Sequence, residues 1–275
     1  MGALIHTLER NFTVTVEVVP PAGADASAVL ESLASLDPSL FYGYSVATNP
    51  VAKAHLSALA LCSLVQARTS KPAILHCTTR DHNALGLQAL LWGARALGLD
   101  TVLAATGDTI AYRRRYHTTA VGDLDVFALI GMARQAGLCT GVVFDPRPER
   151  DGLKREADRL KRKVESGAQF AVTQPVYSIE AAERVAEATA SAGIPILLGI
   201  LPLRTFRHAE FLHERVAGIA VPEPVRRRMA EARNPPHEGI SMSRDLLMRV
   251  RGMYSGACLM PPFGHYEIVE AILAA

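Results

Sequence analysis

Eight short apolar segments recur along this chain, each followed by a helical pattern, at a spacing of roughly 30 residues. The segments are rich in β-branched residues and almost free of charge, which is typical of strands buried on both faces of a parallel sheet. We predict strands at 13–19, 41–46, 73–78, 101–105, 140–144, 170–174, 195–200 and 257–260. Eight such units in 275 residues favour one α/β domain over residues 1–275, a single closed (β/α)8 TIM barrel.

A missing glycine motif and several helix-start signals refine this prediction. No Gly-x-Gly-x-x-Gly follows the first strand, which argues against an open doubly wound sheet. Between the strands, Asn49-Pro50 is expected to open a helix that runs to about Arg68, because proline is favoured in a first helical turn. Asp81 or Asn83 is expected to cap the next helix, and Ser241 or Ser243 a helix near the end of the chain.

Composition excludes several classes of protein. Hydrophobic residues make up 49% and the formal net charge is +2, so neither nucleic acid nor a membrane surface is an expected partner. No run approaches the roughly 20 apolar residues of a membrane span, and the apolar N-terminal run is too short for a signal peptide. The four cysteines are scattered within apolar segments and predict buried thiols in a reducing cytoplasm, not a metal site.

The fourth predicted strand leads into Thr106-Gly107-Asp108. Glycine permits a sharp turn as the chain leaves the strand. Asp108 would then lie at the carboxyl end of the strand, where α/β proteins gather their catalytic groups. Capping of the following helix is the alternative role for this carboxylate.

Glu17 lies among valines in the first predicted strand. An unpaired buried charge costs several kcal/mol, so the carboxyl is expected either to be neutral or to be paired. If it is neutral, burial raises its pKa and makes it a candidate general acid. The alternative is a salt bridge to a base on a neighbouring strand.

Other candidates near the strand ends are open to two interpretations. Gln174 is either a ligand-binding amide or a polar residue satisfied by a loop backbone. His76 is either a core histidine or a ligand, and Phe206 is either a core residue or a stacking platform. Arg113-Arg114-Arg115 follows the fourth predicted strand. The run could bind phosphates or an acidic partner, or it could belong to a solvated loop. His208 and His213 are expected on the surface of a helix.

Several of these residues belong to stretches that together resemble the methylenetetrahydrofolate reductase family along nearly the whole chain. The matching stretches stand in family order at residues 16–21, 76–83, 105–108, 161–168, 173–177, 199–202 with Phe206, and 218–222. The segment Cys258–Glu267 resembles the reductase half of bifunctional homocysteine methyltransferase–reductase proteins.

The resemblance implies a flavin-dependent enzyme of one-carbon metabolism and methionine biosynthesis. It would reduce 5,10-methylenetetrahydrofolate to 5-methyltetrahydrofolate in a ping-pong reaction, with NAD(P)H, such as NADH, as donor and FAD as cofactor. Glu17 matches the general acid, Asp108 the carboxylate near flavin and pterin, and Gln174 and Phe206 the substrate-binding residues. The implied FAD contacts are Ser45, His76, Ala105, Thr106, Gly107, Asp108, Phe144, Glu156, Arg162 and Lys163.

Departures from the family pattern leave two alternatives open. The arginine run at 113–115 and the altered flavin positions suggest a non-catalytic or partner-dependent subunit that binds folate or flavin. Those positions hold Ser45, Phe144, Ala120 and Val121 in place of the usual family residues. A reductase that has lost FAD and passes hydride directly from NAD(P)H to folate is the other. A homo-oligomer is expected, with an electron-transfer protein or a methyltransferase as a further partner.

Overall fold

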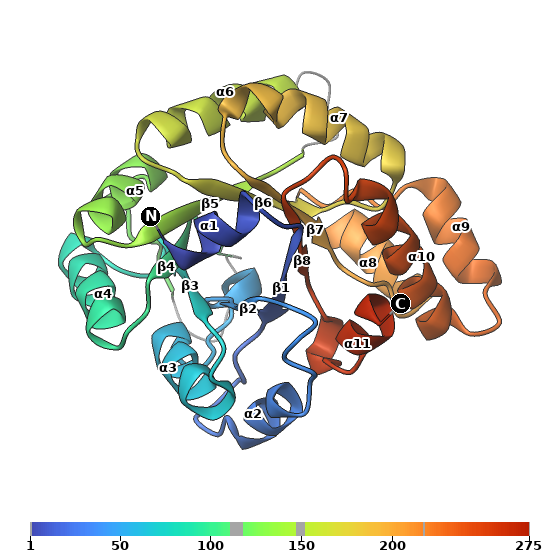
Figure 1. Cartoon of the computed structure of the whole chain (residues 1–275), viewed down its shortest axis with the longest axis horizontal. Helices are drawn as coiled ribbons and strands as arrows, with labels where there is room; N and C mark the ends of the chain where they lie inside the picture. The colour runs from blue at the N-terminus through green and yellow to red at the C-terminus, as the bar shows by residue number, and fades with distance from the viewer. Residues whose placement is uncertain (1, 111–117, 147–151, 217, 275) are drawn as a thin grey trace.

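The computed structural model describes residues 2–110, 118–146, 152–216 and 218–274. It contains a closed barrel in which eight parallel strands pair in sequence order and β8 returns to β1 (Figure 1). The strands are β1 (Thr13–Val18), β2 (Gly43–Val46), β3 (Ala73–Thr78), β4 (Thr101–Ala105), β5 (Cys139–Phe144), β6 (Phe170–Pro175), β7 (Ile196–Ile200) and β8 (Gly256–Leu259). The predicted fold class and all eight predicted strand positions are confirmed.

Helices surround the barrel and follow the strands as the sequence pattern predicted. The helices are α1 (Ala3–Leu8), α2 (Ser27–Ala34), α3 (Ala58–Thr69), α4 (Ala84–Ala96), α5 (Val126–Gln135), α6 (Gly152–Glu165), α7 (Ile179–Thr189), α8 (Phe206–Arg215), α9 (Glu223–Glu231), α10 (Pro235–Val250) and α11 (Ile268–Leu273).

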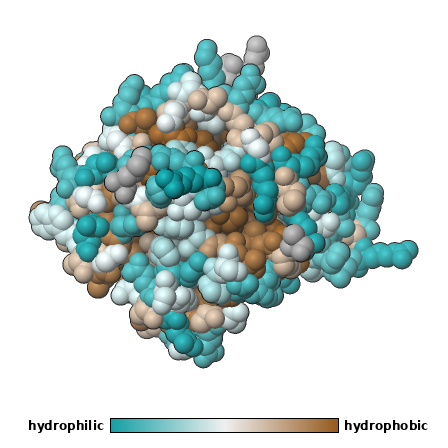
Figure 2. Space-filling model, in the orientation of Figure 1, coloured by the Kyte–Doolittle hydropathy of each residue, from teal (hydrophilic) through white to brown (hydrophobic). Residues whose placement is uncertain are grey.

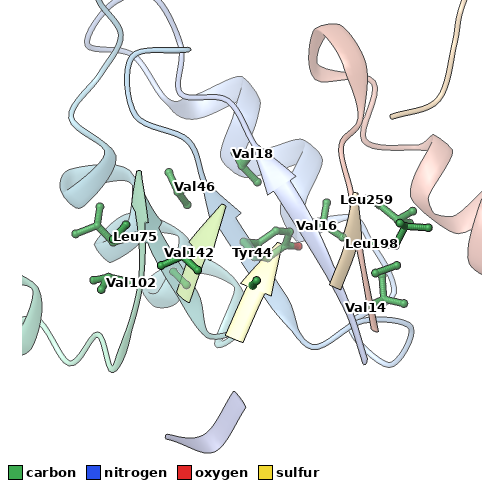
Figure 3. Packing of buried hydrophobic residues seen from close by; sticks show 14 of the residues in the cluster. Val14, Val16, Val18, Tyr44, Val46, Leu75, Val102, Val142, Leu198 and Leu259 are labelled. Carbon is green, nitrogen blue, oxygen red and sulfur yellow. The ribbon is translucent and has the colours of Figure 1, made fainter. Parts of the chain in front are cut away.

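Alternation along each strand divides the core into two layers. Val14, Val16 and Val18 of β1 point outward and are buried with Tyr44 in the larger apolar cluster (Figure 3). Side chains of the intervening residues, such as Glu17, point into the barrel, because successive residues of a strand face opposite sides. The inner cluster combines Ile74, Leu103, Phe170, Val172, Leu197 and Cys258.

Helix α1 closes one end of the barrel, a feature that the sequence reasoning missed. Leu4, Ile5 and Leu8 are buried in the inner cluster, and α1 lies across the strands in Figure 1. Because α1 precedes β1, it covers the end where the strands begin. The opposite end, where the strands finish, is left for a functional site.

Two predicted helix starts were wrong. The segment after Asn49-Pro50 forms only a 3₁₀ turn at Pro50–Ala52, because Asn49 and Val51 adopt left-handed backbone angles that an α-helix does not accommodate. Helix α3 begins later, where the Ser57 side chain accepts a hydrogen bond from the backbone N–H of Ala60. Helix α10 is capped by Asn234, and Ser243 lies within it and donates to the carbonyl of Gly239.

Mainly hydrophilic residues cover the periphery of the face in Figure 2, with apolar patches between them. In the part of the chain that the structure describes, every helix is either too short or too polar to span a bilayer. All four cysteines are buried and free of disulfides, as the sequence predicted.

Candidate active site

A cavity of about 780 Å³ opens at the carboxyl ends of the strands. Its wall comes from the loop after β2, the ends of β4, β5 and β6, and helices α6 and α8. The lining residues are Val51, Lys53, Ala104, Ala105, Thr106, Gly107, Asp108, Thr109, Val126, Val143, Asp145, Glu156, Arg159, Lys163, Gln174, Phe211, Arg215 and Val216. The volume lies within the range of roughly 300–1,000 Å³ that is usual for small-molecule sites.

Asp108 reaches this cavity through the turn that the sequence predicted. Gly107 has φ +87°, and a Cβ there would come within 3.1 Å of the Cβ of Arg80, so glycine is required by both conformation and space. Asp108 is not the cap of α5, the next helix in the described part of the chain, because Asp125 caps it. Its Oδ2 instead accepts a hydrogen bond of 2.6 Å from the backbone N–H of Val51.

Glu17 lies inside the barrel, where β1 approaches its carboxyl end. Burial, and to a smaller degree the negative charge of Asp108, raises the pKa of Glu17 to about 7. Among the salt bridges between described residues, none involves Glu17. Its charge also contributes to the raised pKa values of Cys258 and Tyr266, which therefore lie near it. These observations support a neutral Glu17 carboxyl over a Glu17 carboxylate in a salt bridge.

Ser45 and His76 form a second polar pair on the neighbouring strands β2 and β3. Ser45 Oγ lies 2.7 Å from His76 Nε2, and Ser45 is directly opposite Glu17 in the pairing of β1 with β2. Burial lowers the pKa of His76 to about 4, so the imidazole is neutral at neutral pH. His76 is therefore bonded to Ser45, the residue opposite the candidate acid Glu17.

One face of α6 contributes a buried ion pair and an arginine that lines the cavity. Lys163 Nζ donates to Glu156 Oε1 at 2.8 Å and to the carbonyl of Val143 at 2.7 Å. Burial lowers the pKa of Lys163, and the carboxylate of Glu156 opposes that shift. Arg159 also lines the cavity, and its buried Nε has no hydrogen-bond partner among the described residues.

The sequence reasoning missed Arg159, although a signal for it exists. Glu156, Arg159 and Lys163 are spaced by three and four residues, which places them on one face of a helix. Arg162 lies off that face, and its guanidinium lies 4.4 Å from the ring centroid of Phe127. Helical spacing would therefore have favoured Arg159 over Arg162 for the cavity.

The cavity lining also lacks four other residues that the resemblance implied: Ser45, His76, Phe144 and Phe206. Phe144 is fully buried in the outer apolar cluster, and the adjacent Val143 and Asp145 line the cavity in its place. Phe206 is 42% exposed at the start of α8, so it is not a core residue, but it does not line the cavity. Phe211, one turn further along α8, does.

Gln174 lines the cavity from the end of β6, and Ala105, Thr106 and Gly107 line it from β4. His208 is buried, contrary to expectation, and its ring contacts Phe263 with 5.0 Å between centroids. The arginine run at 113–115 lies outside the described residues. The site thus combines the carboxylate of Asp108 and a cationic helix face around one cavity. Glu17 is not among the lining residues, but it lies within electrostatic reach of Asp108.

Comparison with known proteins places the chain in a family. The family model for methylenetetrahydrofolate reductase matches residues 3–250. The 5,10-methylenetetrahydrofolate reductase of Buchnera aphidicola subsp. Acyrthosiphon pisum (strain APS) is 24% identical over 217 residues, covering 75% of this chain and 71% of that protein. The corresponding Salmonella typhimurium protein is 25% identical over 221 residues, covering 74% and 69%.

The fold has a relative among solved structures. It is an uncharacterized protein from Clostridium thermocellum that binds two copies of 5-methyl-5,6,7,8-tetrahydrofolic acid. The two structures align with a TM-score of 0.75 over 99% of this chain and 97% of the other, at 15% identity. At that identity the likeness supports the fold. With a family model covering most of its length, this chain belongs to the methylenetetrahydrofolate reductase family.

Proposed function

We propose that this chain, acting as one catalytic domain over residues 1–275, reduces 5,10-methylenetetrahydrofolate to 5-methyltetrahydrofolate with NAD(P)H as donor and FAD as cofactor. One observation carries the proposal: Glu17, with a pKa of about 7, lies within electrostatic reach of Asp108 at the carboxyl end of the barrel. Family membership and the names of the curated relatives support the same reaction. The folate bound by the Clostridium thermocellum protein fits it.

Glu17 supplies the proton in this proposal. A carboxyl with a pKa near 7 is partly protonated at neutral pH, which suits a general acid. Protonation of a nitrogen of the methylene bridge breaks one carbon–nitrogen bond and leaves an iminium cation. Burial inside the barrel favours the protonated form of this acid before substrate binds.

Asp108 supplies negative charge. Its carboxylate is fixed at the cavity edge by the N–H of Val51, so little reorganisation is needed when positive charge develops on the substrate. Gln174 offers an amide to the folate ring from the end of β6. Phe206 is exposed enough to stack on a planar ring that extends beyond the cavity.

The cavity residues fit FAD. When bound, FAD would supply the hydride-carrying chemistry between NAD(P)H and the folate. The unpaired Nε of Arg159, together with Lys53 and Arg215, suits a diphosphate, because arginine and lysine are the usual phosphate partners. The backbone of residues 104–108 and the exposed ring of Phe211 offer hydrogen bonds and a stacking surface.

The test is an absorbance spectrum of the purified protein with identification of any released flavin. Bound FAD that is bleached by NADH or NADPH and restored by methylenetetrahydrofolate would support the proposal. The outward Phe144 and Arg162 favour direct hydride transfer as a second candidate. A colourless protein that still oxidises NAD(P)H only when folate is present would select that candidate. A colourless protein without this activity would leave a binding subunit.

A further inference from the structure

We propose that Arg80 and Asp81 are positioning residues, which lock the loop at residues 49–53 so that the Val51 N–H holds the carboxylate of Asp108. This inference rests on the proposed role of Asp108. The loop joins β2 to α3, whereas Arg80 and Asp81 follow β3 and Asp108 follows β4. Three consecutive strand ends therefore meet around one carboxylate.

The loop is held in a conformation that it would not adopt by itself. Asn49, Val51 and Ala52 have φ values of 41°, 49° and 52°. Left-handed angles are unfavourable for residues other than glycine, and most of all for a β-branched valine. Such strain persists only where surrounding contacts impose it, and it is concentrated at functional sites.

One of those contacts comes from Arg80. Its side chain is 5% exposed and donates from Nε and Nη2 to both carboxylate oxygens of Asp81, at 2.6 and 2.7 Å. Nη2 also donates to the carbonyl of Asn49 at 3.1 Å, and Nη1 donates to the carbonyl of Asp108 at 3.3 Å. One guanidinium thus connects the loop with the turn after β4.

Asp81 completes the lock from the other side of the loop. Its Oδ2 accepts from Asn49 Nδ2 at 3.0 Å and from Thr78 Oγ1 at 3.3 Å. Asn49 Oδ1 in turn accepts from the backbone N–H of His55 at 3.1 Å. Asn49 is therefore held through its side chain and its carbonyl, which fixes the strained residues that follow it.

The result of this lock is the 2.6 Å bond from the Val51 N–H to Asp108 Oδ2. Arg80 also packs against Gly107, where an added Cβ would lie 3.1 Å from its Cβ, so this side chain contacts both the turn after β4 and the loop. Val51 and Lys53 of the same loop line the cavity beside Asp108. A planar five-donor fork is needed to reach all these acceptors, and a lysine ammonium cannot replace it.

A double-mutant cycle on folate reduction tests the inference. Arg80→Lys should lower kcat by about ten- to hundredfold, because it releases the loop and displaces the carboxylate. Combined with Asp108→Ala, Arg80→Lys should cause no further loss, since it acts through that carboxylate. Losses that multiply in the double variant would overturn the inference, as would a fully active Arg80→Lys variant.

Arg226→Lys is the matched control. Arg226 Nη1 donates to Glu210 at 2.8 Å between α9 and α8, so the change also removes an arginine–carboxylate contact, but outside the cavity. We expect this variant to keep its kcat. If Arg226→Lys lost as much kcat as Arg80→Lys, general destabilisation would explain both losses. That result would overturn the positioning role of Arg80.

Hydrogen exchange separates this inference from the proposed reaction, because it needs no turnover. The Val51 amide should be protected in the unaltered protein and should exchange faster in both Arg80→Lys and Asp108→Ala. An amide that exchanges equally fast in all three proteins overturns the lock even if folate is reduced. Slow exchange in the unaltered protein without folate reduction would retain the lock and reject the reaction.

Discussion

The negative charge of Asp108 acts on Glu17, although Glu17 lies in β1, Asp108 follows β4, and these two strands do not pair. Burial raises the pKa of Glu17, and the negative charge of Asp108 raises it further, to about 7. The first carboxyl is thereby suited to hold a proton at neutral pH, while the second is held by a backbone N–H. An acid and a stabilising carboxylate in one barrel mouth form the basis of the proposed reaction.

Replacing the acid should separate the two half-reactions. Glu17→Gln cannot donate a proton, so folate reduction should be abolished while FAD reduction by NAD(P)H continues at nearly the original rate. Stopped-flow absorbance of the flavin measures each half-reaction separately. Glu180→Gln, which changes an exposed carboxylate at the start of α7, is the control. If Glu17→Gln still reduces folate, the acid has been assigned to the wrong residue.

The same residue should make folding stability depend on pH. The folded protein holds the Glu17 proton up to about pH 7, whereas the ordinary value is 4.5. The contribution of Glu17 to the free energy of unfolding is therefore full below pH 4.5. It falls by up to about 3 kcal/mol as the pH rises from 4.5 through 7. Urea unfolding should show Glu17→Gln to be more stable than the unaltered protein at pH 8.5 and similar at pH 4.5. A difference that is independent of pH would contradict the raised pKa.

Removing the charge of Asp108 should slow folate reduction selectively. Asp108→Asn keeps the size of the side chain and an oxygen that can accept from Val51 N–H, but it loses the negative charge. We expect kcat for folate reduction to fall at least about tenfold. Steady-state kinetics with saturating NAD(P)H provide the measurement. An unchanged rate would reduce Asp108 to a structural anchor of the loop.

Arg159 and Arg162 should differ in their effect on cofactor binding. Arg159→Ala removes a cation that lines the cavity and whose buried Nε has no hydrogen-bond partner among the described residues. The dissociation constant for FAD should rise about tenfold. Arg162→Ala removes a cation that lies on Phe127, and it should have a smaller effect. Titration of the apoprotein, followed by flavin fluorescence, compares the two variants. A larger loss of FAD affinity in Arg162→Ala than in Arg159→Ala would indicate that Arg162 binds the phosphates.

The sequence predicted the barrel because its signals are local and repeated. Strands buried on both faces appear as continuous apolar runs, and Gly107 marks the turn after β4. Glu17 was conspicuous because a charge among buried valines needs an explanation. Resemblance named the family, which the family model confirms.

Other features depend on contacts that no local pattern contains. Asn49-Pro50 resembles a helix start, but bonds from Arg80 and Asp81 hold Asn49 in a left-handed conformation. Resemblance alone assigned Phe144 and Arg162 to the flavin, whereas strand alternation and helical spacing turn their side chains away from the cavity. The oligomeric state, the methyltransferase partner and the likeness of residues 258–267 to bifunctional proteins stay predictions.

The central claim is that electrons pass from NAD(P)H through FAD to methylenetetrahydrofolate in this cavity. The most direct measurement is anaerobic absorbance at the flavin bands. We expect NADH or NADPH to bleach the bound FAD and methylenetetrahydrofolate then to restore the oxidised spectrum, with 5-methyltetrahydrofolate as product. A protein that binds no FAD, or whose reduced flavin is not reoxidised by the folate, would contradict it.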